Sequence, residues 1–348
     1  MNRGVFFPLP CKSLVTMLRH VLQAAVMFTI MHSLVGFAQP VSVTVQAQRL
    51  AALLPDQHPV RIAFIDLSDL ARPGVTVVKL SGEVVSSFAL PASAYDADWI
   101  HWGPGIQYDR PANALWVLFP RVGYTAFALE GRPLTRVPFP SASHQLQILD
   151  NGHFVSPYSW DRPADAQVVE VTREGRVAWS WHARDFVDAL DIVQSPALGQ
   201  PQSYTATVSA VKTPGGHYWV ALAQRNVIVR VDAEGRVIER HVARERPHTL
   251  VVEGESLVGY TLRDPNRVVV RNEACGCMRE YPVHEALPGG RRTRSLSLQK
   301  VAPGLWFVSG VTGLYLMTDD GDIVWRLRHS ALNGRPQGFH AAVVFKSP

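Results

Sequence analysis

Residues 227–238 read Val-Ile-Val-Arg-Val-Asp-Ala-Glu-Gly-Arg-Val-Ile, two short apolar runs separated by a turn at Gly235. Short runs rich in valine, isoleucine and aromatic residues and broken by glycine are typical of β-hairpins, and glycine tolerates the positive φ of a tight turn. The same arrangement recurs at Gly82, Gly131, Gly175, Gly235, Gly276 and Gly321, with 41 to 60 residues between successive glycines. Because a period in the forties suits a blade of four strands, the repeat predicts an all-β fold, a β-propeller.

Two further apolar runs precede the hairpin in each repeat. In the third repeat they are residues 145–149 and 153–155, and in the fourth they are residues 206–211 and 218–222. Each repeat therefore offers four strands, and we expect six blades, with seven as the alternative. The longer interval before Gly235 predicts a short helical insertion around Ala183 to Leu190.

The two ends of the array fit each other. The first repeat, from about Val60 to Pro91, has room for three strands only, and the chain ends on a strand candidate from His340 to Phe345. We therefore predict that the C-terminal strand completes the first blade and closes the ring, which removes exposed sheet edges. The propeller would span residues 59–348, after a linker at residues 39–58.

The N-terminal segment has the pattern of an export signal. Lys12 and Arg19 precede an apolar run from Val21 to Ala38 that ends in small residues. The run is also nearly long enough to cross a bilayer. We expect residues 1–38 to be a signal peptide cleaved near Ala38 or, alternatively, a retained membrane anchor. The propeller would then be periplasmic or secreted, and membrane-bound only through that anchor.

Charge and cysteine content narrow the function classes. The net charge of +5 comes from arginines scattered over turns, without the clusters of basic and aromatic residues that nucleic-acid binding needs. We therefore expect no nucleic-acid partner. Cys275 and Cys277 flank the fifth turn glycine, where they form either a local disulfide or a pair of thiols. Two cysteines are too few for a metal site, and we predict none there.

Histidines open four of the six innermost strand candidates at about the same register: His101, His144, His248 and His340. The fourth and sixth repeats have Tyr204 and Arg294 there. In a propeller these residues would ring one end of the central channel. Such a ring could bind a metal, supply general acid and base, or provide a nucleophile. Trp179 and Trp325, at equal spacing after their turn glycines, are predicted to pack between blades.

Three segments resemble the bacterial arylsulfotransferase-type propeller family. The first runs from Asp98-Trp-Ile-His101 through Leu115-Trp-Val-Leu118 to Arg121, the second from His144 to the Asn-Gly turn at Gly152, and the third from Val168 to Trp179. The resemblance covers residues 97–243 well, and the other repeats only by register.

The resemblance implies a six-bladed periplasmic propeller that moves a sulfuryl group from a phenolic sulfate ester to a phenol without a nucleotide donor or other cofactor. A histidine would carry the group covalently, while other histidines and an arginine stabilise its oxygens. His101, Arg121 and His144 match motif positions, whereas His248 and His340 match by their place at a strand start.

One departure from the family pattern supports a second hypothesis. Trp102 and Gly103 stand where the family has Asn-Ser. The alternative to an enzyme is therefore a non-catalytic propeller of the cell envelope that binds a ligand or a protein partner. A metal-dependent enzyme that uses the same histidines is also open.

Overall fold

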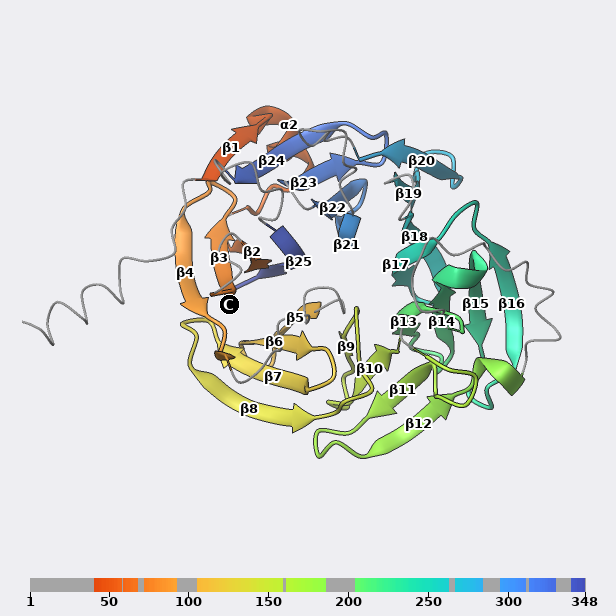
Figure 1. The fold of residues 1–348 in the computed structure, drawn as a ribbon. Coiled ribbons are helices and arrows are strands. Elements are labelled where there is room, and N and C mark those ends of the chain that lie inside the picture. Colours follow the sequence, from red (N-terminus) through yellow and green to blue (C-terminus); the bar gives the residue numbers. More distant parts are fainter. Residues whose placement is uncertain are drawn as a thin grey trace, which may run out of the picture. The chain divides into compact units, whose positions relative to one another are not determined.

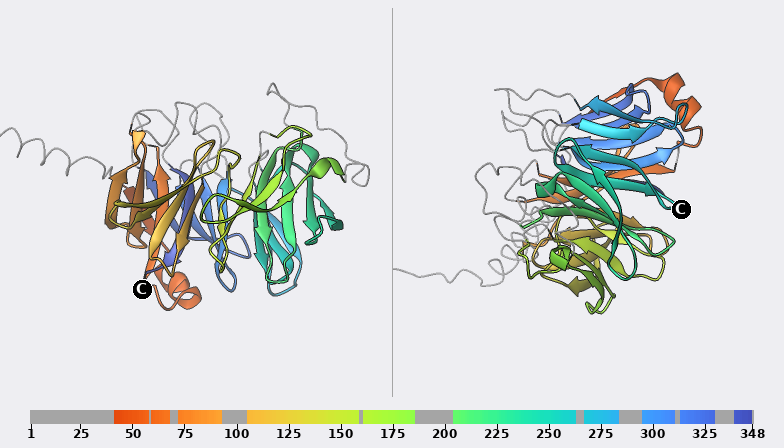
Figure 2. Two further views of the ribbon diagram at one scale, coloured as in Figure 1. Left: turned by 90° about the horizontal axis from the view of Figure 1, so that it is seen from below. Right: turned by 90° about the vertical axis from the view of Figure 1, so that its right-hand side faces the viewer.

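The computed structural model describes residues 41–57, 59–67, 72–92, 105–158, 161–185, 204–262, 267–283, 295–310, 313–329 and 339–347. Six antiparallel sheets in this part of the chain stand around a common axis (Figure 1), and the strands of each sheet run between the two ends of the ring (Figure 2). The all-β, six-bladed propeller predicted from the repeat is confirmed, and the seven-bladed alternative is wrong.

Four strands build each blade. From the axis outwards, blade 1 contains β25 (Phe339–Lys346), β2 (Val60–Asp66), β3 (Gly74–Lys79) and β4 (Val84–Ala89), and blade 2 contains β5 (Gly105–Asp109), β6 (Ala114–Phe119), β7 (Gly123–Ala128) and β8 (Pro133–Pro138). In the same order, blade 3 contains β9 (Gln147–Ile148), β10 (Phe154–Pro157), β11 (Val168–Val171) and β12 (Val177–Trp181), and blade 4 contains β13 (Thr207–Lys212), β14 (Tyr218–Leu222), β15 (Val227–Val231) and β16 (Val237–Val242). Blade 5 contains β17 (Pro247–Glu253), β18 (Ser256–Leu262), β19 (Arg267–Arg271) and β20 (Met278–Pro282), and blade 6 contains β21 (Ser295–Ala302), β22 (Leu305–Gly310), β23 (Gly313–Thr318) and β24 (Ile323–His329).

The C-terminal strand closes the ring as predicted. Strand β25 pairs antiparallel with β2, with Ile62 opposite Val344, and becomes the innermost strand of blade 1. Blade 1 is thus built from both ends of the propeller sequence. Because the first repeat supplies β2, β3 and β4 only, the blade is complete only when β25 has joined it.

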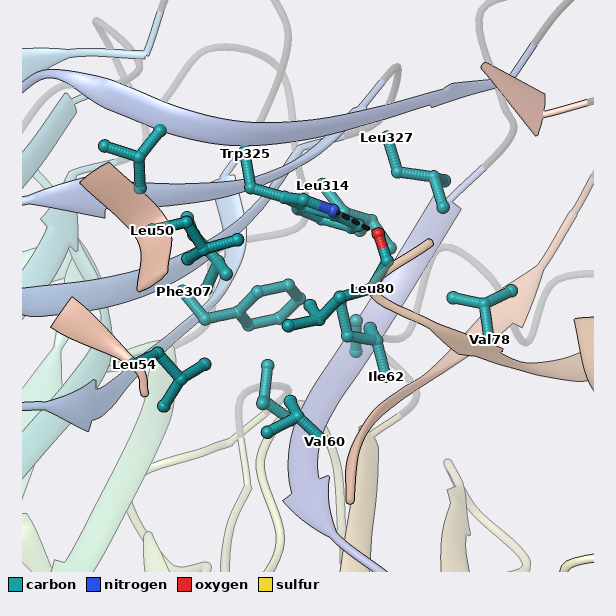
Figure 3. Close-up of a cluster of buried hydrophobic side chains, with 14 of the residues drawn as sticks. Leu50, Leu54, Val60, Ile62, Val78, Leu80, Phe307, Leu314, Trp325 and Leu327 are labelled. Atoms are coloured by element: carbon teal, nitrogen blue, oxygen red, sulfur yellow. Dashed lines mark hydrogen bonds between the residues drawn. The ribbon is translucent and has the colours of Figure 1, made fainter. Parts of the chain in front are cut away.

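The segment that was expected to be a linker is part of the propeller. Strand β1 (Val41–Val45) pairs with β24 and adds a fifth strand to the outside of blade 6, and helix α2 (Ala47–Leu53) follows it. Leu50 and Leu54 are buried in the cluster that contains Phe307 and Trp325 (Figure 3). The alternating Val-Ser-Val-Thr-Val of β1 is a strand pattern too short to stand out in the sequence.

Other sequence-based expectations meet the described residues only in part. Residues 183–185 form a single 3-10 turn, and the rest of the insertion expected up to Leu190 lies outside the described residues. Residues 1–38, expected to be a signal or an anchor, also lie outside them. Within the described ranges, none of the helices has the length and apolar character needed to cross a bilayer.

The hydrophobic core is divided into six clusters, one at each interface between neighbouring blades. Strand β6 shows the reason, since all six of its residues are buried. Its alternate side chains point to opposite faces of the sheet. Leu115 and Val117 pack toward blade 1, whereas Trp116 and Leu118 pack toward blade 3. Both faces of each blade are therefore apolar, and each needs a neighbour.

Most of the recurring glycine turns lie against a neighbouring blade, although nothing lies within 4 Å of a Cβ built at Gly276. All six turn glycines have positive φ, between 63° and 94°. At Gly131 a Cβ atom would collide with the Phe88 ring of the preceding blade, and at Gly321 it would collide with the Tyr281 ring. Glycine is needed at Gly131 and Gly321 both for the backbone conformation and for the close approach of the preceding blade.

Tryptophans on the fourth strand of a blade form hydrogen bonds to the next blade. Trp325 donates from Nε1 to the carbonyl oxygen of Leu80 in blade 1, at 2.7 Å (Figure 3). Trp179 donates to the carbonyl oxygen of Ala233 in blade 4, at 2.9 Å, and stacks on Tyr218 with ring centroids 3.8 Å apart. The predicted role of Trp179 and Trp325 in packing between blades is confirmed.

Glutamine side chains join the innermost strands of neighbouring blades. Gln147 accepts a hydrogen bond from the Lys212 amide at 2.7 Å and donates one to the Lys212 carbonyl at 3.0 Å. Gln299 does the same with Val344, at 2.9 and 2.8 Å. Between these described strands the neighbouring sheets have no backbone hydrogen bonds, and these glutamine side chains supply hydrogen bonds in their place. They connect the innermost strands of neighbouring blades.

A buried carboxylate links blades 3 and 4. Glu170 accepts hydrogen bonds from Lys212, Tyr218 and His153, each at 2.7 Å, and its side chain is only 5% exposed. Burial alone would raise the pKa of Glu170, but these three hydrogen bonds outweigh it and lower the pKa to about 2. The ionised carboxylate is therefore part of the folded interface.

We predict that Trp325→Phe lowers the free energy of unfolding by about 1–2 kcal/mol, because it removes a fully buried hydrogen bond and leaves the Leu80 carbonyl without that donor. Trp179→Phe is the matched control. Its hydrogen bond is half exposed, so it should lose less. Denaturant unfolding of the two variants measures the difference, and equal losses would contradict the assignment.

We also predict that Glu170→Gln lowers the free energy of unfolding at pH 7 by about 2–3 kcal/mol, since it leaves Lys212 without its buried counter-charge. Because the folded pKa lies below the ordinary 4.5, this contribution is complete above that value and is lost as the pH falls toward 2. Unfolding curves at pH 7 and pH 3 should therefore differ less for the variant than for the natural chain. An equal acid sensitivity would contradict this role.

Candidate functional site

The innermost strands place three of the five predicted site residues, His144, His248 and His340, at one end of the ring. His248 and His340 are the second residues of β17 and β25, and His144 lies three residues before β9. The described part of β5 begins at Gly105, and His101 lies outside the described residues. For His340 the structure gives the place in the backbone only. We call this end of the channel the histidine mouth.

The structure brings the rings of His144 and His248 together. Their centroids are 5.4 Å apart, and their planes meet at 59°. The two residues come from blades 3 and 5, which are not neighbours, because blade 4 lies between them (Figure 1). Both rings must therefore extend inward across the start of blade 4. At this distance the two rings contact each other, so a small ligand would lie against the pair and not between the imidazoles.

Backbone conformation directs His144 inward. The residue has φ of 65°, in the left-handed region that non-glycine residues seldom adopt. Ser143 is buried and donates its amide to the carbonyl of Pro157 at 3.1 Å, which fixes the chain just before the histidine. The first residue of β5, Gly105, lies so close that a Cβ there would be 2.8 Å from the His144 carbonyl oxygen.

An irregular strand start directs His248. The pairing of β17 with β18 shifts register between Pro247 and Leu250, as in a β-bulge. Thr249 donates its amide to the Thr261 hydroxyl at 3.0 Å in place of a regular ladder bond. Bulges re-aim side chains and are common beside functional sites.

Backbone strain is concentrated at the histidine mouth. Five described residues other than glycine have positive φ: Asn113, Arg121, His144, Ala206 and Asn226. All but Asn113 lie at this end of their blades, where the innermost strands begin. Residues held in sparsely populated conformations cluster at ligand sites because the surrounding structure can make such strain useful.

Blade 4 has a tyrosine and an arginine at the same end of the ring as the histidines. Tyr204 occupies the register of His144, three residues before β13. The Nε of Arg225 donates to the Tyr204 carbonyl at 3.0 Å, and its guanidinium lies 5.1 Å from the centre of the Tyr204 ring. Arg225 ends the 3-10 helix η4 (Ala223–Arg225).

A buried carboxylate holds this part of blade 4. Asp161 accepts hydrogen bonds from the Thr205 amide at 3.0 Å, the Thr205 hydroxyl at 2.6 Å and the Ala206 amide at 3.0 Å. Burial raises the pKa of Asp161 against the opposing effect of these hydrogen bonds. Blade 3 thus fixes the backbone beside Tyr204.

Sequence reasoning missed Arg225. A single arginine between two strands has no motif. The only signal was the register of Tyr204 with His144.

Arg121 lies farther from the axis than the histidines. It is exposed on the turn between β6 and β7, the second and third strands of blade 2, at the same end of the ring. Burial and the Asp165 carboxylate raise the pKa of Tyr158, and the positive charge of Arg121 opposes this. The turn that carries Arg121 lies one strand outside the innermost strands.

This arrangement allows acid–base or nucleophilic chemistry on an anion. Two imidazoles can exchange protons or attack an electrophile, and guanidinium groups can stabilise negative oxygens. Among the described residues, no group of three or more His, Cys, Asp or Glu side chains could hold a metal ion.

Comparisons with known proteins concern the fold alone. No protein-family model and no curated protein matches the sequence. A protein of unknown function from Bacteroides caccae is 12% identical and matches 83% of this chain and 100% of its own, with a TM-score of 0.56. A chain of the nidogen/laminin complex has the same identity and coverage and a TM-score of 0.52. Virginiamycin B lyase from Staphylococcus aureus is 13% identical over 73% of each chain, with a TM-score of 0.43.

The contact between Gly105 and His144 generates a prediction. In Gly105→Ala the new Cβ should displace the His144 backbone and alter the packing of the His144 and His248 rings. Gly74→Ala is the matched control, because its Cβ would be 2.7 Å from the Phe88 carbonyl in blade 1. Both variants should be destabilised to a similar degree, but only Gly105→Ala should shift the NMR signals of the two imidazole rings. Unchanged signals in Gly105→Ala would contradict the contact.

Proposed function

We propose that the chain is an arylsulfotransferase-like enzyme that transfers a sulfuryl group from a phenolic sulfate ester to a phenol at the histidine mouth. The observation that carries the proposal is the approach of His144 and His248 to 5.4 Å from two separate blades. Such a pair suits a reaction that needs a nucleophile and a proton carrier close to each other at one small group. The resemblance of residues 97–243 to that family supports the choice of sulfuryl transfer.

The reaction would proceed in two displacements. An imidazole nitrogen of one histidine attacks sulfur, the N–S bond forms, and the bond between sulfur and the aryl oxygen breaks. The phenolate leaves with the electron pair of that bond and takes a proton from the other histidine. In the second half, the acceptor phenol gives its proton to that histidine and attacks sulfur, which breaks the N–S bond and restores the first imidazole.

Cationic groups would stabilise the oxygens of the group in transfer. Arg225 is held beside Tyr204, between the blades that carry the two histidines. Arg121, the family's motif arginine, is placed to attract the sulfate ester from outside the channel. A guanidinium in a site shielded from water stabilises developing negative charge strongly. The net charge of +5 also favours anionic substrates.

The proposed location follows from the N-terminal pattern. Residues 1–38 would direct the propeller to the periplasm or the exterior, free or anchored. A phenolic sulfate ester would suit that compartment as donor, because the proposed reaction requires no nucleotide and no cofactor.

The test is a transfer assay with p-nitrophenyl sulfate as donor and phenol as acceptor. We expect release of nitrophenol that depends on the acceptor. Alanine at the nucleophile, His144 or His248, should abolish it with every donor. Alanine at the proton carrier should retain the single-turnover burst of nitrophenol from p-nitrophenyl sulfate, whose leaving group is a stable anion. Steady transfer to phenol should fall at least about 100-fold, because the acceptor has lost its base.

His241→Gln is the matched control, because His241 lies on the outermost strand β16 and contacts Tyr260. It should leave transfer unchanged. His101→Ala belongs in the same series as a motif position. Activity that survives substitution of His144 and of His248 would overturn the proposal. A folded protein with no transfer at all would favour the non-catalytic binding propeller.

A further inference from the structure

A disulfide joins Cys275 and Cys277 on the turn between β19 and β20. Both residues are exposed, and one glycine separates them. The turn lies at the opposite end of blade 5 from His248, because β17 begins at the histidine mouth and β19 runs away from it. It is therefore independent of the proposed sulfuryl transfer.

The turn does not need the disulfide. In the other five blades the amide of the turn glycine donates to a carbonyl three residues earlier, and the hairpin forms without cysteines: Gly82 to Lys79, Gly131 to Ala128, Gly175 to Thr172, Gly235 to Asp232 and Gly321 to Thr318. In blade 5 the Gly276 amide donates to the Asn272 carbonyl and the Asn272 amide donates to the Cys277 carbonyl, each at 2.8 Å. Backbone hydrogen bonds thus already close this turn.

A disulfide of this spacing also adds little to stability. Crosslinks stabilise mainly by restricting the unfolded chain, and the effect is smallest for the shortest loops. In this turn the loop contains a single residue between the cysteines. The bond is therefore poorly explained as a structural staple, and its exposure makes it open to attack by a thiolate.

One contact favours a particular direction of cleavage. The Cys277 amide lies 3.4 Å from the Cys275 sulfur and is oriented to donate to it. A backbone N–H directed at sulfur stabilises a thiolate there. Cys275 is then the better leaving group, and Cys277 is the sulfur that an incoming thiolate attacks.

We propose that Cys275–Cys277 is a thiol–disulfide exchange site that oxidises a cysteine pair of a partner protein. A partner thiolate attacks the Cys277 sulfur, a mixed disulfide forms, and Cys275 leaves as a thiolate. The second partner thiolate then attacks the mixed disulfide. The partner leaves with a disulfide, and Cys275 and Cys277 remain as two thiols that accept the partner's protons. A low-molecular-weight disulfide, such as oxidised glutathione, restores the bond by the same exchange.

The test uses the full-length protein with Cys11→Ser, so that the remaining cysteine does not enter the thiol count. A reduced peptide with two cysteines is the probe. We expect each peptide oxidised to be matched by two new thiols on the protein. Dithiothreitol should reduce the Cys275–Cys277 disulfide at least about 10-fold faster than it reduces oxidised glutathione. Reduction should lower Tm by less than about 2 °C, as expected for a bond that the fold does not need.

Two variants complete the design. The double variant Cys275→Ser/Cys277→Ser should fold and show no exchange. Cys275→Ser, which retains the attacked sulfur, should form a lasting mixed disulfide with glutathione more readily than Cys277→Ser. The proposal is overturned if reduction lowers Tm by more than about 5 °C, if exchange is slower than with oxidised glutathione, or if both cysteines stay reduced in an excess of oxidised glutathione.

Discussion

The structure depends on the fact that both faces of each blade are apolar. A sheet with one buried face can stop at its neighbour, but a blade such as that containing β6 has leucine and valine on one side and tryptophan and leucine on the other. Each blade therefore requires two neighbours, and a row of such blades is satisfied only when it returns to its start. The six interfacial clusters, the turn glycines and the tryptophan hydrogen bonds all serve that closure.

Closure also creates the candidate site. The innermost strands all begin at one end, so residues at that register converge on the axis although they are distant in the sequence. His144 and His248 are separated by the whole of blade 4 along the chain, and their rings still approach to 5.4 Å. The left-handed backbone at His144 and the irregular pairing at the start of β17 turn them inward. The regular part of each blade provides rigidity, and its irregular ends position the two imidazoles.

The sequence predicted the parts of this architecture that repeat. The glycine period indicated six blades, the shortened first repeat and the C-terminal apolar run indicated the closing strand, and the equal spacing of Trp179 and Trp325 indicated their packing role. The parts that occur once were missed. Strand β1 and helix α2 are too short to show a clear period, and their pairing with blade 6 depends on residues nearly 300 positions away. Arg225 and the direction of the two imidazoles depend on local backbone geometry, which residue type alone does not determine.

Two strand pairings between residues far apart in the sequence, β1 with β24 and β2 with β25, affect how the chain reaches its folded state. Strand β1 must wait for β24, and strand β2 must wait for β25, so the first strands of the propeller find their partners only among its last strands. Contacts between such distant positions make folding slow. While the chain emerges from the ribosome, blades 2 to 5 can assemble in order, but the two flanking blades stay unfinished. A chain that stops short of β25 would leave an unpaired strand edge and an uncovered apolar face at the same place, and would be exposed to aggregation.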